Sequence, residues 1–309
     1  MRIAVMGTGA VGGYFGAKLA AAGDDVVFIV RQRHLPALRR DGLRIESPAG
    51  DLHVQNGFFT DSPADAGTVD LVLFCVKSYD TAEAAAALAP MMTKETAILS
   101  LQNGIDNPDK IAGFWSTGRT LAGVVYIGSQ VSAPGVIQHS SGGKIVFGPI
   151  SDDGADTAHS TEQALTRASI PCVVSATIEQ VQWAKLLWNA PFCAISCLTR
   201  ATVREIVESE ALNNIVRDCM KEVQAAARTR GIDLNTELLD QTLDFSRDLG
   251  DFKPSMLQDL EASKPLEYDA LNGIVMRLLE QAGEQAPINR VFHSTLGFLD
   301  KKLRQEASR

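Results

Sequence analysis

The sequence of 309 residues is poor in cysteine, histidine and aromatic residues. Its five cysteines are odd in number and include no CxxC pair, so we expect a reducing compartment and neither a disulfide framework nor a structural zinc. Its five histidines are dispersed and form no HExxH motif, so we expect no metal site. No apolar run approaches the ~20 residues of a membrane span, and glycine comes too early in the opening MRIAVMGTGAVGG for a signal peptide. We therefore expect a cytoplasmic protein with no membrane partner.

A basic surface that would attract nucleic acid is also missing. The net charge is −8 at pH 7, and both halves of the chain carry more acidic than basic residues, so we expect no nucleic-acid partner. With 45% hydrophobic and 21% charged residues, the composition is typical of a globular protein. The length exceeds the ~100–200 residues of one domain, which predicts two domains.

The first part of the chain has the pattern of a mostly parallel sheet with crossover helices. Short apolar, β-branched runs alternate with alanine-rich segments. The predicted strands are Ile3–Met6, Val26–Val30, Leu71–Val76 and Ala97–Leu101, and the predicted helices are Val11–Ala22 and Thr81–Leu88. From about Leu121 to Phe147, turn signals at Pro134-Gly135 and Gly142-Gly143 predict a smaller antiparallel portion of the same sheet.

Beyond about Ile178 the strand signal disappears. Apolar residues between Leu212 and Val223 recur at helical spacing, and Gly231 follows them as a stop. Another periodic run begins at Pro287 and ends near Leu303. This part of the chain is therefore predicted to be all-helical.

A glycine-rich motif lies between the first predicted strand and helix. Its residues are Gly7, Thr8, Gly9, Ala10, Val11 and Gly12. In this context Gly7 permits a tight turn, Gly9 lets the backbone approach a pyrophosphate, and Gly12 lets the helix pack on the strand. The helix N-terminus adds free N–H donors and a partial positive charge. The sequence thus predicts an α/β fold with a Rossmann-type dinucleotide-binding domain over residues 1–178, followed by an all-helical domain over residues 179–309.

The residues at the end of the second predicted strand indicate whether the site binds NAD or NADP(H). An NAD site needs a carboxylate there for the ribose hydroxyls, whereas this chain has Arg31-Gln32-Arg33. A guanidinium matches the charge and geometry of a 2′-phosphate, so the sequence favours NADP(H). The alternative is that these arginines are solvated loop residues.

Polar residues also follow the next two predicted strands. Lys77 comes after DLVLFCV, and Asn103 lies in SLQNG. The carboxyl ends of parallel strands are the ligand side of such a sheet, so both are candidate cofactor contacts. Each is otherwise an ordinary strand-end turn residue.

In the helical part, EQVQWAKLLWN places Lys185 and Asn189 on one helix face. Lys185 is either a stem that reaches water or a catalytic ammonium. Further along the chain, Ser255 and Glu267 supply a hydroxyl and a carboxylate. Their structural alternatives are a helix N-cap for Ser255 and a first-turn acid for Glu267.

The order of these motifs resembles the ketopantoate reductase (2-dehydropantoate 2-reductase) family from residue 1 to about residue 290. The motifs are GTGAVG, Arg31, VKSYDT, SLQNG, WAKLLWN, SMLQD and LEYDALNG. The resemblance implies NADPH-dependent reduction of a small 2-oxo acid, ketopantoate, to the 2-hydroxy acid pantoate. It places the reaction in a cleft between a Rossmann domain and a helical domain, and leaves a homodimer open.

The resemblance also implies residue roles. Lys185 falls on the catalytic lysine, which also contacts substrate, and Glu267 falls on the essential glutamate. Asn189 and Ser255 fall on substrate-binding residues. The cofactor residues are Arg31 and Lys77 at the adenosine-phosphate end, and Asn103, which touches both nicotinamide and substrate.

Several positions depart from the family's pattern. Three places where members acting on ketopantoate often carry asparagine hold Cys193, about Val203 and Phe252. Pro191 is expected to interrupt the helix with Lys185, and Trp188 and Phe192 make its surroundings more apolar. Two alternatives follow: a reductase of the same fold for a more apolar 2-oxo acid, and a non-catalytic NADPH-binding redox sensor.

Overall fold

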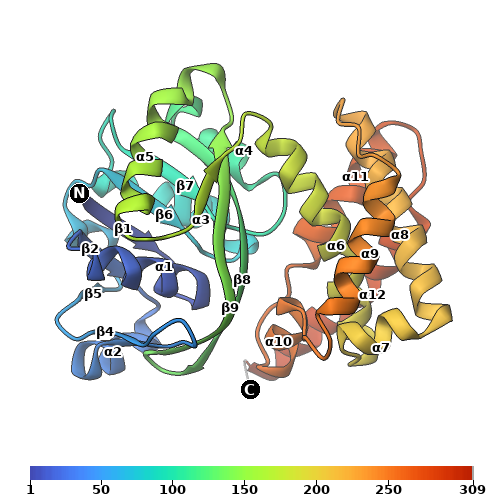
Figure 1. Ribbon diagram of the computed structural model, residues 1–309, viewed down its shortest axis with the longest axis horizontal. Coiled ribbons are helices and arrows are strands. Elements are labelled where there is room, and N and C mark those ends of the chain that lie inside the picture. The colour runs from blue at the N-terminus through green and yellow to red at the C-terminus, as the bar shows by residue number, and fades with distance from the viewer. Residues whose placement is uncertain (308–309) are drawn as a thin grey trace. The chain divides into compact units, whose positions relative to one another are not determined.

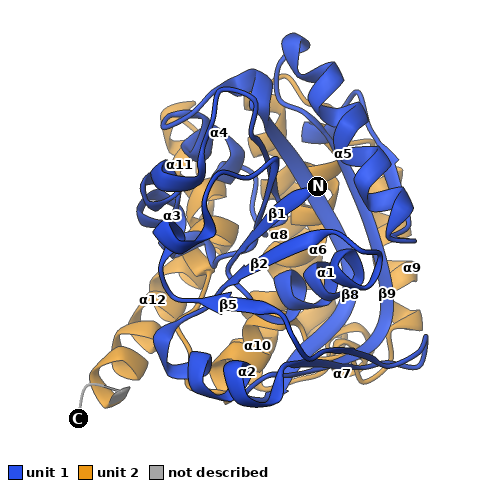
Figure 2. Ribbon diagram, turned by 90° about the vertical axis from the view of Figure 1, so that its left-hand side faces the viewer, with its two compact units in different colours: residues 1–179 blue, residues 180–309 orange. Residues whose placement is uncertain are grey.

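The computed structural model describes residues 1–307. The chain divides into two compact units, residues 1–179 and residues 180–309, which Figure 2 shows in different colours. Within the described residues, no helix is long and apolar enough to cross a membrane.

Unit 1 is built on one mixed sheet, which has ten strands in the described part of the chain (Figure 1). The strands are β1 (Arg2–Met6), β2 (Asp25–Ile29), β3 (Leu43–Glu46), β4 (Leu52–Val54), β5 (Phe58–Thr60), β6 (Leu71–Phe74), β7 (Ala97–Ser100), β8 (Thr120–Ala133), β9 (Val136–Pro149) and β10 (Cys172–Val174). Their order is β4-β3-β9-β8-β7-β6-β1-β2-β5, and β10 pairs with β9. The run from β5 through β2, β1, β6 and β7 to β8 is parallel, whereas β8 and β9 are antiparallel.

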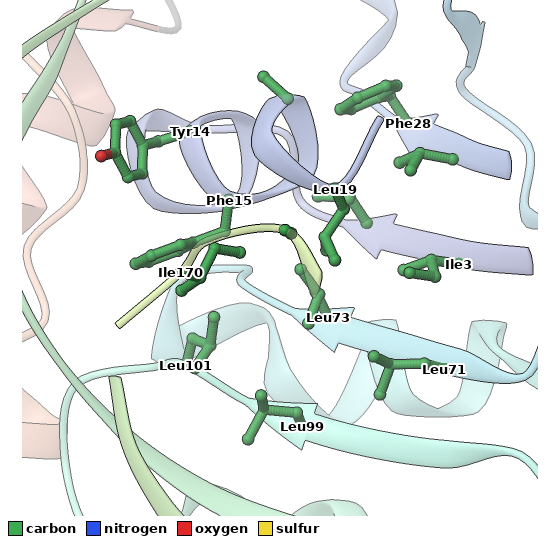
Figure 3. Close-up of a cluster of buried hydrophobic side chains, with 14 of the residues drawn as sticks. Ile3, Tyr14, Phe15, Leu19, Phe28, Leu71, Leu73, Leu99, Leu101 and Ile170 are labelled. Atoms are coloured by element: carbon green, nitrogen blue, oxygen red, sulfur yellow. The ribbon is translucent and has the colours of Figure 1, made fainter. Parts of the chain in front are cut away.

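Helices cover both faces of this sheet, so its central strands are apolar on both sides. The helices are α1 (Ala10–Ala21), α2 (Leu35–Asp41), α3 (Thr81–Ala87), α4 (Asn107–Ala112) and α5 (Ala155–Arg167). In β1, Ile3 and Val5 belong to one buried cluster, while Ala4 and Met6 belong to a second. Figure 3 shows the first cluster, with Phe15 and Leu19 of α1 lying against the strands.

The predicted strands and helices of this unit are confirmed to within two residues at each end. Two features of the sheet differ from the prediction. One is a set of short strands that the sequence pattern did not indicate, and the other is a predicted turn. The short strands β3, β4, β5 and β10 have too few residues for a clear alternation. The prediction of a turn at Gly142-Gly143 is wrong, because both residues lie inside β9, where the pairing register shifts between Tyr126 and Ile127. There the glycines, which have φ values of 76° and 110°, accommodate a bulge instead of a chain reversal.

Among its described residues, unit 2 contains helices joined by loops and no strand. Its helices are α6 (Ile178–Thr199), which begins just before the unit boundary, α7 (Val203–Glu208), α8 (Glu210–Thr229), α9 (Glu237–Asp248), α10 (Ser255–Glu261), α11 (Ile274–Gln281) and α12 (Pro287–Ala307). A π-helical turn over Asp269–Gly273 leads directly into α11. The expectation that Pro191 interrupts the helix with Lys185 is wrong, because α6 continues through it. The neighbours of Pro191 in α6 are fully buried, and this packing holds the helix together despite the missing N–H donor.

Candidate functional site

The glycine motif forms the turn from β1 to α1. Gly7 has a φ of 97°, and a Cβ there would lie 2.8 Å from the backbone nitrogen of Val76. A Cβ on Gly12 would lie 2.4 Å from the carbonyl oxygen of Gly7, so only glycine lets α1 pack this closely. By contrast, nothing lies within 4 Å of a Cβ placed on Gly9. The turn thus packs tightly against neighbouring backbone at Gly7 and Gly12 and is open at Gly9. A bound pyrophosphate needs such an open approach to the backbone.

Arg31 and Lys77 lie at the ends of the two strands that flank β1. Each has extended backbone angles and immediately precedes a short 3-10 turn, Gln32–His34 after Arg31 and Ser78–Asp80 after Lys77. Because β1 pairs in parallel with both β2 and β6, these residues and the glycine turn share one edge of the sheet. Two cations therefore flank the turn.

Arg31 has two partners from the segment after β6. Its Nη2 lies 2.7 Å from Oδ2 of Asp80. The Tyr79 side chain also forms a hydrogen bond with Arg31, and, although burial opposes them, Asp80 and Tyr79 raise the pKa of its guanidinium. Arg31 is thus an exposed side chain whose guanidinium two neighbours hold. Sequence reasoning missed Tyr79 and Asp80, although both stand in the VKSYDT motif.

Asn103 lies in a loop after β7 that buried hydrogen bonds tie to the loop after β6. Its carbonyl oxygen accepts a hydrogen bond from Nδ2 of Asn107 at 2.7 Å. The neighbouring Gln102 donates through Nε2 to the carbonyl oxygen of Val76 at 3.0 Å and to the hydroxyl of Thr81 at 2.8 Å. This network fixes the backbone of Asn103 relative to that of Lys77. Sequence reasoning missed these supporting residues, whose signal is their place inside the SLQNG and VKSYDT motifs.

In unit 2, α6 carries Lys185 and Asn189 one turn apart. Asn189 is buried. Burial lowers the pKa of Lys185 to about 8, against the opposing effects of Cys193 and of the Glu267 carboxylate. Lys185 as a whole is half-buried, and these surroundings limit the contact of its ammonium with water. They also show that Lys185, Cys193 and Glu267 are close enough to interact electrostatically.

Glu267 and Ser255 each lie at the start of a helical segment of unit 2. Glu267 is only 6% exposed and directly precedes Tyr268, the N-cap of the π-helical turn, so it is a buried carboxylate beside that helix start and not a solvated one. Ser255 is the first residue of α10 and is exposed. The N-cap position of that helix belongs to Pro254, so the interpretation of Ser255 as an N-cap is wrong.

The positions that depart from the family's pattern form an apolar group beside α6. The rings of Trp188 and Phe192 stack with centroids 5.2 Å apart, and Phe252 lies 6.3 Å from Trp188. The backbone nitrogen of Val203 donates to the carbonyl oxygen of Phe252 at 3.0 Å. Cys193 and Val203 are both buried. The more apolar surroundings expected from the sequence are therefore present.

The polar and charged residues fit a dinucleotide at the strand ends of unit 1 and an acid–base pair in unit 2. The open backbone at Gly9 and the flanking Arg31 and Lys77 match the pyrophosphate and the 2′-phosphate of NADP(H). Among residues 1–307, no group of three or more His, Cys, Asp and Glu side chains is arranged to hold a metal ion.

Family models cover most of the chain. The model described as ketopantoate reductase PanE/ApbA matches residues 3–152, and the model for the C-terminal part of the same family matches residues 177–300. The chain belongs to the ketopantoate reductase family. The 2-dehydropantoate 2-reductases of Pyrococcus abyssi and Mesorhizobium japonicum are 32% and 30% identical to it. The alignments cover 94% of both chains for the first, and 90% of this chain and 91% of the relative for the second.

Solved structures agree with this assignment. A PanE/ApbA family ketopantoate reductase from Ralstonia eutropha superposes with a TM-score of 0.90 at 33% identity, covering 98% of this chain and 100% of that one. The 2-dehydropantoate 2-reductase of Geobacter metallireducens gives 0.91 at 28% identity, covering 98% and 99%. A D-mandelate dehydrogenase bound to NADH gives 0.91 at 19% identity, covering 98% and 100%, which shows a shared fold. The predicted Rossmann-type domain followed by a helical domain is thus the fold of ketopantoate reductases.

Proposed function

We propose that this ketopantoate reductase family member reduces 2-dehydropantoate to pantoate with NADPH. Members of the family are NADPH-dependent reductases of a 2-oxo acid, and the relatives named for this reaction match over at least 90% of the chain. The observation that carries the proposal is the electrostatic interaction of Lys185, whose pKa is lowered to about 8, with the buried Glu267. A redox sensor that only binds NADPH needs neither residue.

Lys185 acts as the general acid in this proposal. NADPH, when bound, supplies the hydride that reduces the ketone carbon of the substrate. Negative charge then grows on the carbonyl oxygen, and the Lys185 ammonium both stabilises this charge and donates the proton that completes the hydroxyl. Glu267 favours the protonated form of Lys185 against the effect of burial.

The remaining residues bind and orient. Asn189 and the exposed Ser255 bind the substrate carboxylate without adding net charge, and Asn103 contacts both nicotinamide and substrate. At the other end of the cofactor, the Gly7–Gly12 turn holds the pyrophosphate, and Arg31 and Lys77 hold the 2′-phosphate. The buried hydrogen bonds of Gln102 support this arrangement by fixing the loop of Asn103.

One observation favours a second candidate substrate. Trp188, Phe192 and Phe252 form an aromatic group along the helix that carries Lys185 and Asn189, and Cys193 replaces a polar amide on the same helix. Such surroundings suit a 2-oxo acid with a larger apolar side chain than ketopantoate. The reaction and the roles of Lys185 and Glu267 are the same for both substrates.

Steady-state rates of NADPH oxidation test the proposal. We expect the highest kcat/KM with 2-dehydropantoate in a panel that also contains 2-oxo-3-methylbutanoate and phenylglyoxylate. A clear preference for phenylglyoxylate would favour the second candidate. No oxidation with any of the three, together with tight NADPH binding, would favour the sensor. We further propose a cytoplasmic location. We also propose a homodimer, and light scattering of the purified protein tests this oligomeric state.

A further inference from the structure

A carboxylate lies beside the end of β2, although the residues that directly follow β2 in the sequence include none. Dinucleotide sites that bind NAD take this carboxylate from the end of β2, where the chain has Arg31. In the structure, Asp80 comes from the segment after β6, and its Oδ2 lies 2.7 Å from Nη2 of Arg31. The strands β2 and β6 lie on either side of β1. The ion pair therefore joins side chains from opposite sides of the glycine turn.

Asp80 has no competing role in the helix that it precedes. It occupies the N-cap position of α3, where an aspartate side chain usually accepts a hydrogen bond from the first turn. No such capping hydrogen bond is present there. Its side chain is 35% exposed and that of Arg31 is 53% exposed, so the pair is open to a ligand from solvent.

Asp80 offsets part of the positive charge that Arg31 and Lys77 offer to a 2′-phosphate at this end of the site. Arg31 and Lys77 supply two positive charges, and Asp80 removes one of them. A 2′-phosphate brings roughly 1.5 to 2 negative charges at pH 7, as other phosphate monoesters do. A carboxylate 2.7 Å from the Arg31 guanidinium therefore repels the 2′-phosphate of NADPH, whereas the 2′-hydroxyl of NADH can donate a hydrogen bond to it.

We propose that Asp80 is a cofactor-selectivity residue that weakens the preference for NADPH and lets the enzyme use NADH as a second hydride donor. The inference rests on the proposed binding of the adenosine-phosphate end of the cofactor at Arg31 and Lys77. Arg31 attracts the 2′-phosphate, and Asp80 repels it and accepts a hydrogen bond from the 2′-hydroxyl. The two residues thus act in opposite directions on the same atom of the ribose.

Asp80→Asn removes the charge while keeping an oxygen that can accept from Arg31. The Tyr79 side chain also bonds Arg31, so the guanidinium keeps one partner in the variant. The matched control is Glu95→Gln. Glu95 pairs with Arg119 and lies two residues before β7, at the amino ends of the strands and away from the cofactor edge.

The test is fluorescence titration of the purified full chain with NADPH and with NADH, without an oxo acid. In Asp80→Asn we expect NADPH to bind about three- to tenfold more tightly and NADH at least about twofold more weakly, with Glu95→Gln unchanged. A weaker NADPH affinity in Asp80→Asn would overturn the proposal, because Asp80 would then serve to hold Arg31 for the phosphate. An unchanged ratio of the two affinities would overturn it as well. If the wild type bound neither cofactor, the proposed nucleotide site itself would fail and this inference with it.

Discussion

Asn272 donates a hydrogen bond through Nδ2 to the carbonyl oxygen of Ala190 at 3.0 Å. Asn272 lies five residues after Glu267, and Ala190 lies five residues after Lys185 on α6, so this contact joins the segments that carry the proposed acid–base pair. The same Nδ2 donates to Oδ1 of Asn289 at 2.9 Å. Asn289 in turn donates to Glu222 of α8 from its backbone and its side chain. The position of Glu267 relative to Lys185 therefore depends on a fully buried network of amides.

Asn272→Ala is expected to destabilise the protein strongly. It leaves the carbonyl oxygen of Ala190 and Oδ1 of Asn289 buried without this donor, and each lost partner costs roughly 1–3 kcal/mol. Chemical denaturation should show a fall of about 2–4 kcal/mol in the free energy of unfolding. The control is Asn214→Ala on α8, an exposed amide whose loss should cost less than about 0.5 kcal/mol. Equal effects of the two substitutions would show that the network contributes nothing to stability.

Much of this fold could be predicted because its signals are local. The glycine turn, the apolar central strands and the periodic face of α8 all depend on residues close together in the sequence. The spacing of Lys185 and Asn189 likewise places them one turn apart on α6. The sequence at Gly142-Gly143 predicts a turn where the structure has a bulge, because local sequence does not distinguish a glycine that ends a strand from one that relieves a pairing shift.

The contacts that complete the site are distant in sequence and could not be predicted. Arg31 and Asp80 are 49 residues apart, and Asn272 and Ala190 are 82 residues apart. No spacing rule connects such residues, since their proximity results from the order of strands in the sheet and from the packing of helices. Continuation of α6 through Pro191 has the same origin, because tertiary packing outweighs the local cost of the missing N–H donor.

Arg31→Ala is expected to affect NADPH much more than NADH. The substitution removes a guanidinium from the proposed 2′-phosphate site, and a hydrogen bond to a charged group contributes roughly 1.5–3 kcal/mol. The KM for NADPH should therefore rise by about tenfold or more, with a much smaller change for NADH. Steady-state kinetics with each cofactor measure this difference. A similar rise in both KM values would refute the assignment of Arg31 to the 2′-phosphate.

Lys185→Ala is expected to lose turnover while the protein remains folded. General-acid catalysis typically contributes ~10²–10⁴-fold to the rate, so kcat should fall within that range. Circular dichroism and NADPH titration should match the wild type, because Lys185 lies outside the proposed nucleotide site. Lys301→Ala, an exposed substitution on α12, is the control and should keep full activity. A Lys185→Ala enzyme that kept most of its turnover would show that another group supplies the proton.

The pH dependence of the wild type should follow the titration of Lys185. Burial lowers the pKa of this lysine to about 8, and the protonated form is the active acid. The active fraction therefore falls as the pH rises through about 8, and the kcat/KM profile should have its alkaline limb near that pH. An alkaline limb above pH 10, close to an ordinary lysine, would contradict the assignment of Lys185 as the general acid.

Glu267→Gln should move that limb to lower pH. Burial lowers the pKa of Lys185 and the Glu267 carboxylate raises it, so a neutral side chain of the same shape removes the opposing contribution. The pKa of Lys185 should then fall further, and the lysine loses its proton at lower pH. We therefore expect a large loss of kcat/KM above pH 7 and a smaller loss in more acidic buffer. The melting temperature should stay nearly unchanged, because Lys185 can become neutral and leave no buried charge without its partner.

Glu280→Gln is the matched control, since Glu280 is an exposed acid on α11 that pairs with Arg290. It should leave both the pH profile and the melting temperature unchanged, because exposed ion pairs contribute roughly 0–1 kcal/mol. If Glu267→Gln instead kept wild-type kinetics and lowered the melting temperature, Glu267 would be a structural acid at the start of the π-helical turn. The proposed acid–base pair would then reduce to Lys185 alone, and the electrostatic interaction that carries the proposed function would have no catalytic role.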